Sequence, residues 1–229
     1  MTLTHYSYGR GGVGFSERKV HHPVISTTQT LDALPVSVSE VREHLGYGTE
    51  TDVALDAELT AFIKAAQRAV EHYCQDLRLL TSSVVSNLPE LGDQVTLRIR
   101  PYASFTSIGY VDEDGNELTV DANTYHVLIS NQLRADVFLG QDLEWPSVSY
   151  RQDAYRINYV AGWTVETLPE DIKQALLMIV AKFHADRGDC EDSGAQASVY
   201  AMKNAGHSPF PSAAAALLQP YKLMELRTI

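Results

Sequence analysis

Three glycines near the N-terminus have the spacing of a dinucleotide-binding loop. Gly9, Gly11 and Gly14 form a G-x-G-x-x-G pattern. In an oxidoreductase this loop follows a buried strand and opens a helix, whose N-terminus holds the pyrophosphate. Here no aliphatic run precedes the loop, and Pro23 follows without a helical apolar repeat. The glycines therefore predict a flexible arm and no cofactor site.

One acidic stretch begins like a calcium-binding loop. Asp112, Asp114 and Asn116 match its first positions, but the sixth position, where the sharp turn needs glycine, is Glu117. Gly115 lies one place too early. The stretch therefore predicts a hairpin turn.

Other potential metal ligands are scattered. His72 and Cys74 lie two residues apart on a predicted helix and so face different ways. A second group divides between a helix end and a loop, and its members are His184, Asp186 and Cys190. We expect structural roles for these residues and no bound metal.

No recognisable nucleophile motif occurs in the chain. There is no G-x-S-x-G elbow, and no spacing pairs a histidine and a carboxylate with a candidate nucleophile. The sequence therefore favours a protein that is not an enzyme. A small hydrolase or ligand-binding enzyme with its pocket in the β-rich segment is the alternative, because a triad can be assembled by the fold alone.

The composition is that of a folded acidic protein. The chain has 229 residues, of which 45% are hydrophobic, and a formal net charge of −11. Such an excess of carboxylates argues against a protein that grips duplex DNA, whose affinity comes largely from Lys and Arg on phosphates. No stretch is apolar enough to span a bilayer, and no signal-peptide pattern opens the chain. We expect a soluble protein made in a cytoplasm.

Two helices are predicted in the first half of the chain. Ser37 and Glu40 have the spacing of a capping box, and Gly46 should end the short helix that they open. From Val53 to Leu77, apolar residues recur at spacings of three and four, which predicts a long amphipathic helix.

A third helix runs from Pro169 to Arg187, and its centre is apolar nearly all the way round. Such a helix must be covered on several sides, so we expect a neighbouring subunit to supply part of the cover. The residues predicted at this intersubunit contact are Leu176, Leu177, Ile179, Val180 and Phe183. A short last helix should follow Ser212 and end or kink at Pro220.

Between about residues 81 and 163 the apolar period changes to two. Residues 108–120 predict two strands joined by a turn at Asp114 and Gly115. Further strands are predicted in residues 94–100, 124–129, 133–140 and 155–163. Short strands with frequent turn signals indicate an antiparallel sheet or a small barrel-like module.

The predicted fold class is α+β. It is a helical bundle body, made of a short helix, a long helix, a long apolar helix and a short C-terminal helix, with an inserted antiparallel β module. Residues 1–33 are expected to form a flexible glycine-rich arm, residues 34–80 and 167–229 the helical body, and residues 81–166 the β-rich module.

This order of elements resembles the head–tail connector, or adaptor, proteins of long-tailed bacteriophages and phage-like gene transfer agents. The resemblance spans residues 34–223 and rests on "YVAGW" before "LPEDIKQA", on Arg187 at the helix end and on the closing "LLQPYK". It implies a structural virion protein that forms a ring, usually of twelve copies. Such a ring docks beneath the portal protein, receives a stopper or tail-completion protein and extends the DNA exit channel.

The resemblance also implies a location and a set of contacts. The protein would be made in the host cytoplasm and reside in the head–tail neck, where DNA passes without sequence-specific binding and no membrane takes part. The family's C-terminal segment often contacts the portal, and carried over this points to Leu217, Leu218, Tyr221 and Lys222. The chain departs from the family in its long arm before Leu34, in His184 where aromatic residues are frequent, and in Lys222 where Arg is commoner.

Overall fold

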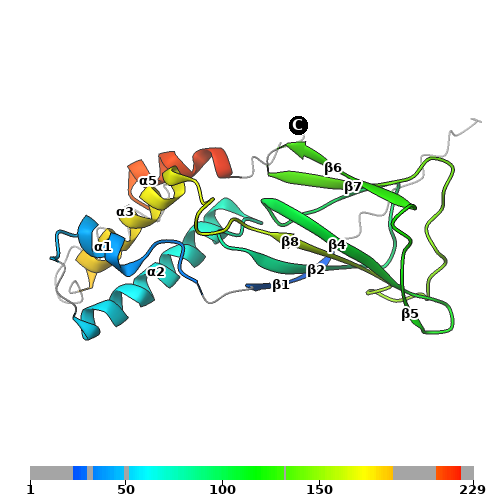
Figure 1. The fold of residues 1–229 in the computed structure, drawn as a ribbon, viewed down its shortest axis with the longest axis horizontal. Coiled ribbons are helices and arrows are strands. Elements are labelled where there is room, and N and C mark those ends of the chain that lie inside the picture. The colour runs from blue at the N-terminus through cyan, green and yellow to red at the C-terminus, as the bar shows by residue number, and fades with distance from the viewer. Residues whose placement is uncertain (1–22, 30–32, 49–51, 132, 188–209, 223–229) are drawn as a thin grey trace, which may run out of the picture.

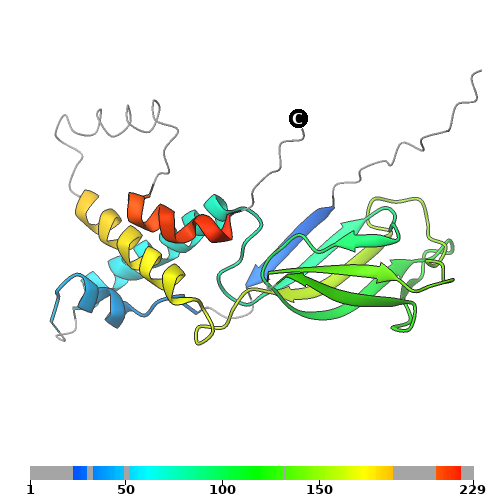
Figure 2. The same ribbon diagram turned by 90° about the horizontal axis from the view of Figure 1, so that it is seen from above.

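The computed structural model describes residues 23–29, 33–48, 52–131, 133–187 and 210–222. Helices gather at one end of an elongated molecule and strands at the other (Figure 1, Figure 2). The mixed α+β class predicted from the sequence is confirmed. Among the described residues, no helix is long and apolar enough to cross a membrane.

The first helix, α1 (Val38–His44), has the predicted ends. The Ser37 hydroxyl accepts a hydrogen bond from the Glu40 N–H, and the Glu40 carboxylate accepts one from the Ser37 N–H at 2.6 Å. Each side chain thus satisfies a backbone donor that the helix leaves open. Gly46 follows at a φ of +76°, the left-handed conformation that ends many helices. The capping box and the glycine stop are confirmed.

The long helix α2 (Val53–Cys74) begins at Asp52, whose carboxylate accepts hydrogen bonds from two backbone N–H groups of the first turn. The helix ends three residues before the predicted Leu77, because Gln75 and Asp76 take positive φ values of 54° and 48°. Its buried stripe has the predicted helical spacing and consists of Leu59, Ile63, Ala66, Gln67, Val70 and Cys74.

The other helices gather around α3 (Glu170–Asp186). Helix α3 contacts α1, α2 and α5 (Ser212–Leu218), and a 3-10 turn, η1 (Gln219–Tyr221), continues α5 where Pro220 ends the regular helix. Together these helices enclose one hydrophobic core.

The β part consists of two antiparallel sheets. The larger has the order β1-β2-β8-β4-β5, formed by β1 (Val24–Gln29), β2 (Ser82–Leu88), β8 (Tyr155–Ala161), β4 (Tyr102–Val111) and β5 (Glu117–Thr119). In β2 and β8, residues alternate between fully and less buried positions, the expected period of two.

A three-stranded sheet of order β3-β7-β6 completes this part, with β3 (Gln94–Thr96), β7 (Arg134–Leu139) and β6 (Tyr125–Asn131). Side chains from the two sheets form a second hydrophobic core. The antiparallel pairing predicted from the strand signals is confirmed. The strand predicted over residues 94–100 is shorter than expected, since β3 ends at Thr96.

Strand β1 corrects the prediction that no regular structure precedes residue 34. Val24–Gln29 pairs along its whole length with β2, from Val24 opposite Asn87 to Gln29 opposite Ser82. Its sequence is mostly Ser, Thr and Gln, with no apolar alternation, because an edge strand gains its place through backbone pairing. The glycine-rich part of the predicted arm, residues 1–22, lies outside the described residues.

Gly162 lies directly after β8, where the sheet meets the helical part. Its φ is +103°, and a Cβ atom at this position would lie 2.2 Å from the Leu80 carbonyl oxygen. The Gly162 N–H also donates to the Pro101 carbonyl at 2.9 Å. Only glycine fits, because both the backbone conformation and the close approach exclude a side chain.

Gly162→Ala should therefore lower the free energy of unfolding by more than about 2 kcal/mol, whereas strain alone costs about 1 kcal/mol. Gly46→Ala is the matched control, because Gly46 has a positive φ but a Cβ atom added there would meet no other atom within 4 Å. Denaturant unfolding of the two variants measures the difference. Equal destabilisation would contradict a steric role for Leu80.

Asp136 joins the three strands of the smaller sheet. This buried carboxylate accepts hydrogen bonds from Thr96 on β3, at 2.6 Å, and from Ser130 on β6. Burial opposes ionisation, but the hydrogen bonds of Ser130, Thr96 and Gln94 outweigh it and lower the pKa of Asp136 below its usual value. The ionised carboxylate is thus the form that holds the strands together.

A lowered pKa in the folded state gives a stability that is present above the unfolded-state pKa of about 3.9 and is lost as the pH falls through the folded value. We expect Asp136→Asn to be less stable than the natural chain at pH 7 and to lose less stability between pH 5 and pH 2. Thermal unfolding across this range checks the prediction. Parallel curves of stability against pH for the two chains would show that Asp136 does not cause the loss of stability in acid.

Candidate docking surfaces

The four residues predicted to contact a portal lie on α5, on η1 and just after it. Leu218 is fully buried against the helical core, so it cannot form a contact surface, and the prediction for this residue is corrected. Leu217, Tyr221 and Lys222 are partly exposed. These three keep an accessible face at the C-terminal end of the helical part and stay the predicted contact residues.

Tyr221 is held firmly by the chain's own side chains. Its hydroxyl donates to both carboxylate oxygens of Asp171 at 2.9 Å, and its ring meets Trp163 edge to face at 6.0 Å. Burial, and then the hydrogen bond and charge of Asp171, raise the pKa of Tyr221. The last described turn is therefore docked onto the start of α3.

The residue beneath this turn is Arg100, which is 4% exposed. Its Nη2 atom donates to the carbonyl oxygens of Cys74, Gln75 and Tyr221 at 3.0 to 3.1 Å. Within the described residues it has no carboxylate partner, and burial lowers the pKa of the guanidinium. The partial negative charge at the C-terminus of α2 supplies part of the compensation. Burial also disfavours the charged form of the neighbouring Cys74 thiol and so raises its pKa to about 11.

Arg100 was not recognised from the sequence. In residues 94–100, Arg98 and Arg100 alternate with apolar residues and look equivalent. The structure separates them, because the side chain of Arg98 is 49% exposed and Arg100 is buried. The one feature that distinguishes Arg100 from Arg98 in the sequence is the proline that follows it, and a following proline does not indicate burial.

Helix α3 presents fewer free apolar residues than predicted. Leu176, Ile179 and Val180 are at most 1% exposed and belong to the chain's own core, so the expectation that they contact a neighbouring subunit is corrected. Leu177 and Phe183 are partly exposed at the rim of that core. These two stay predicted intersubunit residues.

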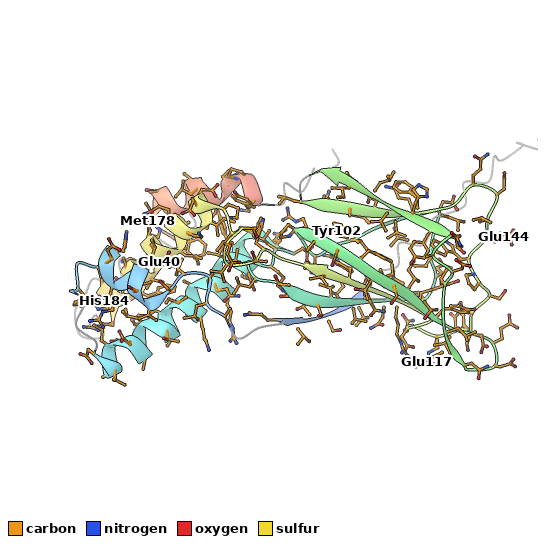
Figure 3. All side chains as sticks on the ribbon, in the orientation of Figure 1. Glu40, Tyr102, Glu117, Glu144, Met178 and His184 are labelled. Carbon is orange, nitrogen blue, oxygen red and sulfur yellow. The ribbon has the colours of Figure 1, made fainter. Side chains whose placement is uncertain are left out.

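His184 lies in an aromatic cluster at the helical end of the molecule (Figure 3). Its Nε2 atom is 3.1 Å from the Tyr47 hydroxyl, and its ring meets those of Tyr47 and Phe62 edge to face at 5.6 and 6.5 Å. Nearby, Arg187 forms an ion pair with Glu58 at 2.6 Å, which ties the end of α3 to α2. The imidazole thus fills a position suited to an aromatic ring.

The acidic stretch read as a hairpin turn does connect β4 and β5. The Asp112 carboxylate accepts hydrogen bonds from the backbone and side-chain nitrogens of Asn116 at 2.7 and 3.0 Å, and Gly115 takes a φ of +87°. Among the described residues, no group of three or more His, Cys, Asp or Glu side chains is arranged to hold a metal ion. Cys190 lies outside the described residues.

A polar groove of about 770 Å³ lies at the junction of α2 with β1 and β2, and Ser82 and Arg98 are its lining residues from the β-rich segment where the enzyme alternative placed its pocket. Its Ser82 hydroxyl already donates to the Leu80 carbonyl at 2.8 Å. The groove is lined by Thr27, Gln29, Arg68, Glu71, His72, Gln75, Asp76, Arg78, Ser82 and Arg98. Half of these ten side chains are ionic, which suits docking of a charged partner.

An α+β chain with separate helical and strand cores and partly exposed ionic and apolar residues has the features of an assembly subunit. Comparison with known proteins identifies its family. The model of the head completion protein family matches residues 36–224. The chain therefore belongs to this family, and it is a structural head–tail connector protein of the virion and not an enzyme.

Solved structures agree in fold. The chain is similar to a chain from the neck of an empty gene transfer agent particle computed with C6 symmetry, with 24% identity, a TM-score of 0.66 and coverage of 89% and 98% of the two chains. A chain from the neck of a native particle computed with C12 symmetry has 24% identity, a TM-score of 0.64 and coverage of 90% and 98%. A chain from the virion of a native particle has 23% identity, a TM-score of 0.60 and coverage of 88% and 97%. No curated protein matches the chain.

The geometry around Tyr221 predicts how firmly the C-terminal turn is held. Tyr221→Phe removes the hydroxyl that donates to Asp171 and should weaken the docking of this turn by about 1–2 kcal/mol. Hydrogen exchange of residues 212–222 should become faster in this variant. Tyr150→Phe is the matched control, because Tyr150 is fully exposed. Unchanged exchange in Tyr221→Phe would show that Arg100 and ring packing hold the turn without the hydroxyl.

Proposed function

We propose that this chain is the adaptor subunit of a head–tail neck. Its copies form a ring, of twelve subunits, that docks below the portal protein. The ring receives a stopper or tail-completion protein on its other side and extends the DNA exit channel. The observation that carries the proposal is the family match over residues 36–224, and the similar neck chains come from particles computed with C6 and C12 symmetry.

We infer a division of labour between the parts of the chain. The helical body, residues 34–80 and 167–229, is a bundle that carries the portal contact, and the β module, residues 81–166, projects from it. The presence of separate hydrophobic cores in the helices and the strands supports this division. Strand β1 is assigned to the module by its pairing, although it precedes the body in sequence.

The charge of the chain supports a role beside DNA. With a net charge of −11, the chain repels phosphates on average. DNA can therefore pass a ring of such subunits without being retained or read. A protein that must bind DNA tightly has the opposite charge balance.

Electron microscopy of the chain co-produced with the portal protein of the same particle tests the proposal. An added annular layer on the portal ring is the expected result, and a bare portal with a separate monomer contradicts it. Deleting residues 212–229 should remove the layer, but it also removes Ala214 and Leu218 from the core. Point substitutions therefore give a cleaner test.

Leu217→Glu and Lys222→Glu change partly exposed residues at the proposed contact and should each reduce occupancy of the layer by about tenfold or more, the effect expected for contact residues in a buried interface. Gln174→Glu is the control, since it alters an exposed position on α3. Thermal unfolding checks that each variant is folded. Full layers with both folded variants would exclude this face as the portal contact.

A further inference from the structure

Arginine side chains gather in the junction groove of an otherwise acidic protein. Arg68, Arg78 and Arg98 line it together with two carboxylates, Glu71 and Asp76. Each carboxylate already has a partner, because Arg78 lies 3.8 Å from Glu71 and Arg98 lies 3.1 Å from Asp76. The groove therefore carries an excess of positive charge.

Arg68 is the source of that excess. It is exposed on α2, and no carboxylate of the described chain lies within ion-pair distance of it. The side chain of Arg98 is also 49% exposed and keeps donors free for a second acceptor. Guanidinium groups with this freedom favour a partner that presents carboxylates.

A matching group of carboxylates occurs on the same chain, in the turn between β4 and β5. Glu113 and Asp114 are exposed, and neither forms an ion pair with the described residues. Asp112 is held by Asn116, so the turn presents these carboxylates on a fixed backbone. Glu117, the first residue of β5, lies at the end of the molecule far from the helices (Figure 3).

We propose that the junction groove of one copy binds the acidic turn, residues 112–116, of the next copy. This proposal rests on the proposed ring and names one contact by which it is built. The groove includes Thr27 and Gln29 of β1, and β1 and β5 are opposite edges of the five-stranded sheet. The turn cannot reach the groove of its own chain, so the partner is a second copy.

The two surfaces lie at diagonally opposite corners of that sheet. Gln29 pairs with Ser82 at the end near the helices, whereas Val111 pairs with Glu117 at the far end. A contact between two different surfaces is heterologous, and repetition of it closes a ring when the rotation between copies allows. The ionic pairing also orients two copies that repel each other through their net charge of −11.

Sedimentation velocity of the purified chain at low salt tests this contact without any portal. We expect the natural chain to self-associate, and to do so less as salt increases, because exposed charges are screened. Arg68→Glu and Glu113→Lys should each weaken self-association about tenfold or more, and an equimolar mixture of the two variants should restore it. Restoration is expected because each substituted surface then meets a surface of opposite charge.

Two matched controls have the same changes of charge outside the proposed contact. Lys182→Glu reverses an exposed cation on α3, and Glu144→Lys reverses an exposed carboxylate in another loop of the strand end. Both should self-associate as the natural chain does, after correction for net charge. Circular dichroism and thermal unfolding establish that all four variants are folded.

A natural chain that stays monomeric at low salt and high concentration would overturn the proposal, as would variants that associate like their controls. Loss of binding to short duplex DNA in Arg68→Glu, with self-association unchanged, would overturn it in favour of a nucleic-acid contact. The adaptor role itself is decided by the annular layer on the portal. The two failures are therefore distinguishable.

Discussion

The buried guanidinium of Arg100 is the interaction on which the arrangement of the two parts depends. It lies where α2 ends, where the chain enters β4 and where the C-terminal turn returns, and it donates to the backbone carbonyls of Cys74 in α2 and Tyr221 in η1. Removing a charge from water is unfavourable unless hydrogen bonds compensate, so these carbonyls must stay in place for the side chain to remain buried. The backbone of Arg100 adds two more links, since its N–H donates to Asp76 and its carbonyl accepts from Arg78, each at 2.7 Å. One residue thus couples the helical core to the sheets through both its side chain and its backbone.

A rigid joint is useful to a protein that must present different surfaces to different neighbours. The helices and the sheets have separate hydrophobic cores, and a flexible link between them would leave their relative orientation undefined. The positive φ angles of Gln75 and Asp76 turn the chain sharply out of α2, and Gly162 lets the returning β8 pass close to Leu80. These local conformations fix where the chain enters and leaves the sheets, and a β-bridge between Leu80 and Trp163 holds the two crossings side by side. The proposed ring needs such a fixed angle, because a small error in each subunit accumulates around a closed circle.

Features encoded by neighbouring residues could be predicted from the sequence, and features created by distant contacts could not. Ser37, Glu40 and Gly46 specify both ends of α1 through hydrogen bonds within a few residues, so the prediction was confirmed. Strand β1 was missed because its place depends on β2, more than 50 residues later, and its own side chains carry no apolar alternation. The apolar centre of α3 predicted cover on several sides, but sequence cannot say whether such cover comes from the same chain. For Leu176, Ile179 and Val180 it does, because α1, α2 and α5 all contact this helix.

The acidity of the chain places opposite demands on it. Carboxylates that keep DNA from adhering to a channel also repel identical subunits. At physiological salt both repulsions are largely screened beyond about 8 Å. Assembly therefore depends on contacts that act at close range, either apolar faces such as the rim of the helical core or local pairs of opposite charge. An acidic protein can supply such pairs without becoming basic overall if its arginines are concentrated in one place and matched by carboxylates in another. Arg68, Arg78 and Arg98 in the junction groove have that distribution. In the proposed ring, the charge pattern thus reconciles a surface that releases DNA with a surface that recognises its own copy.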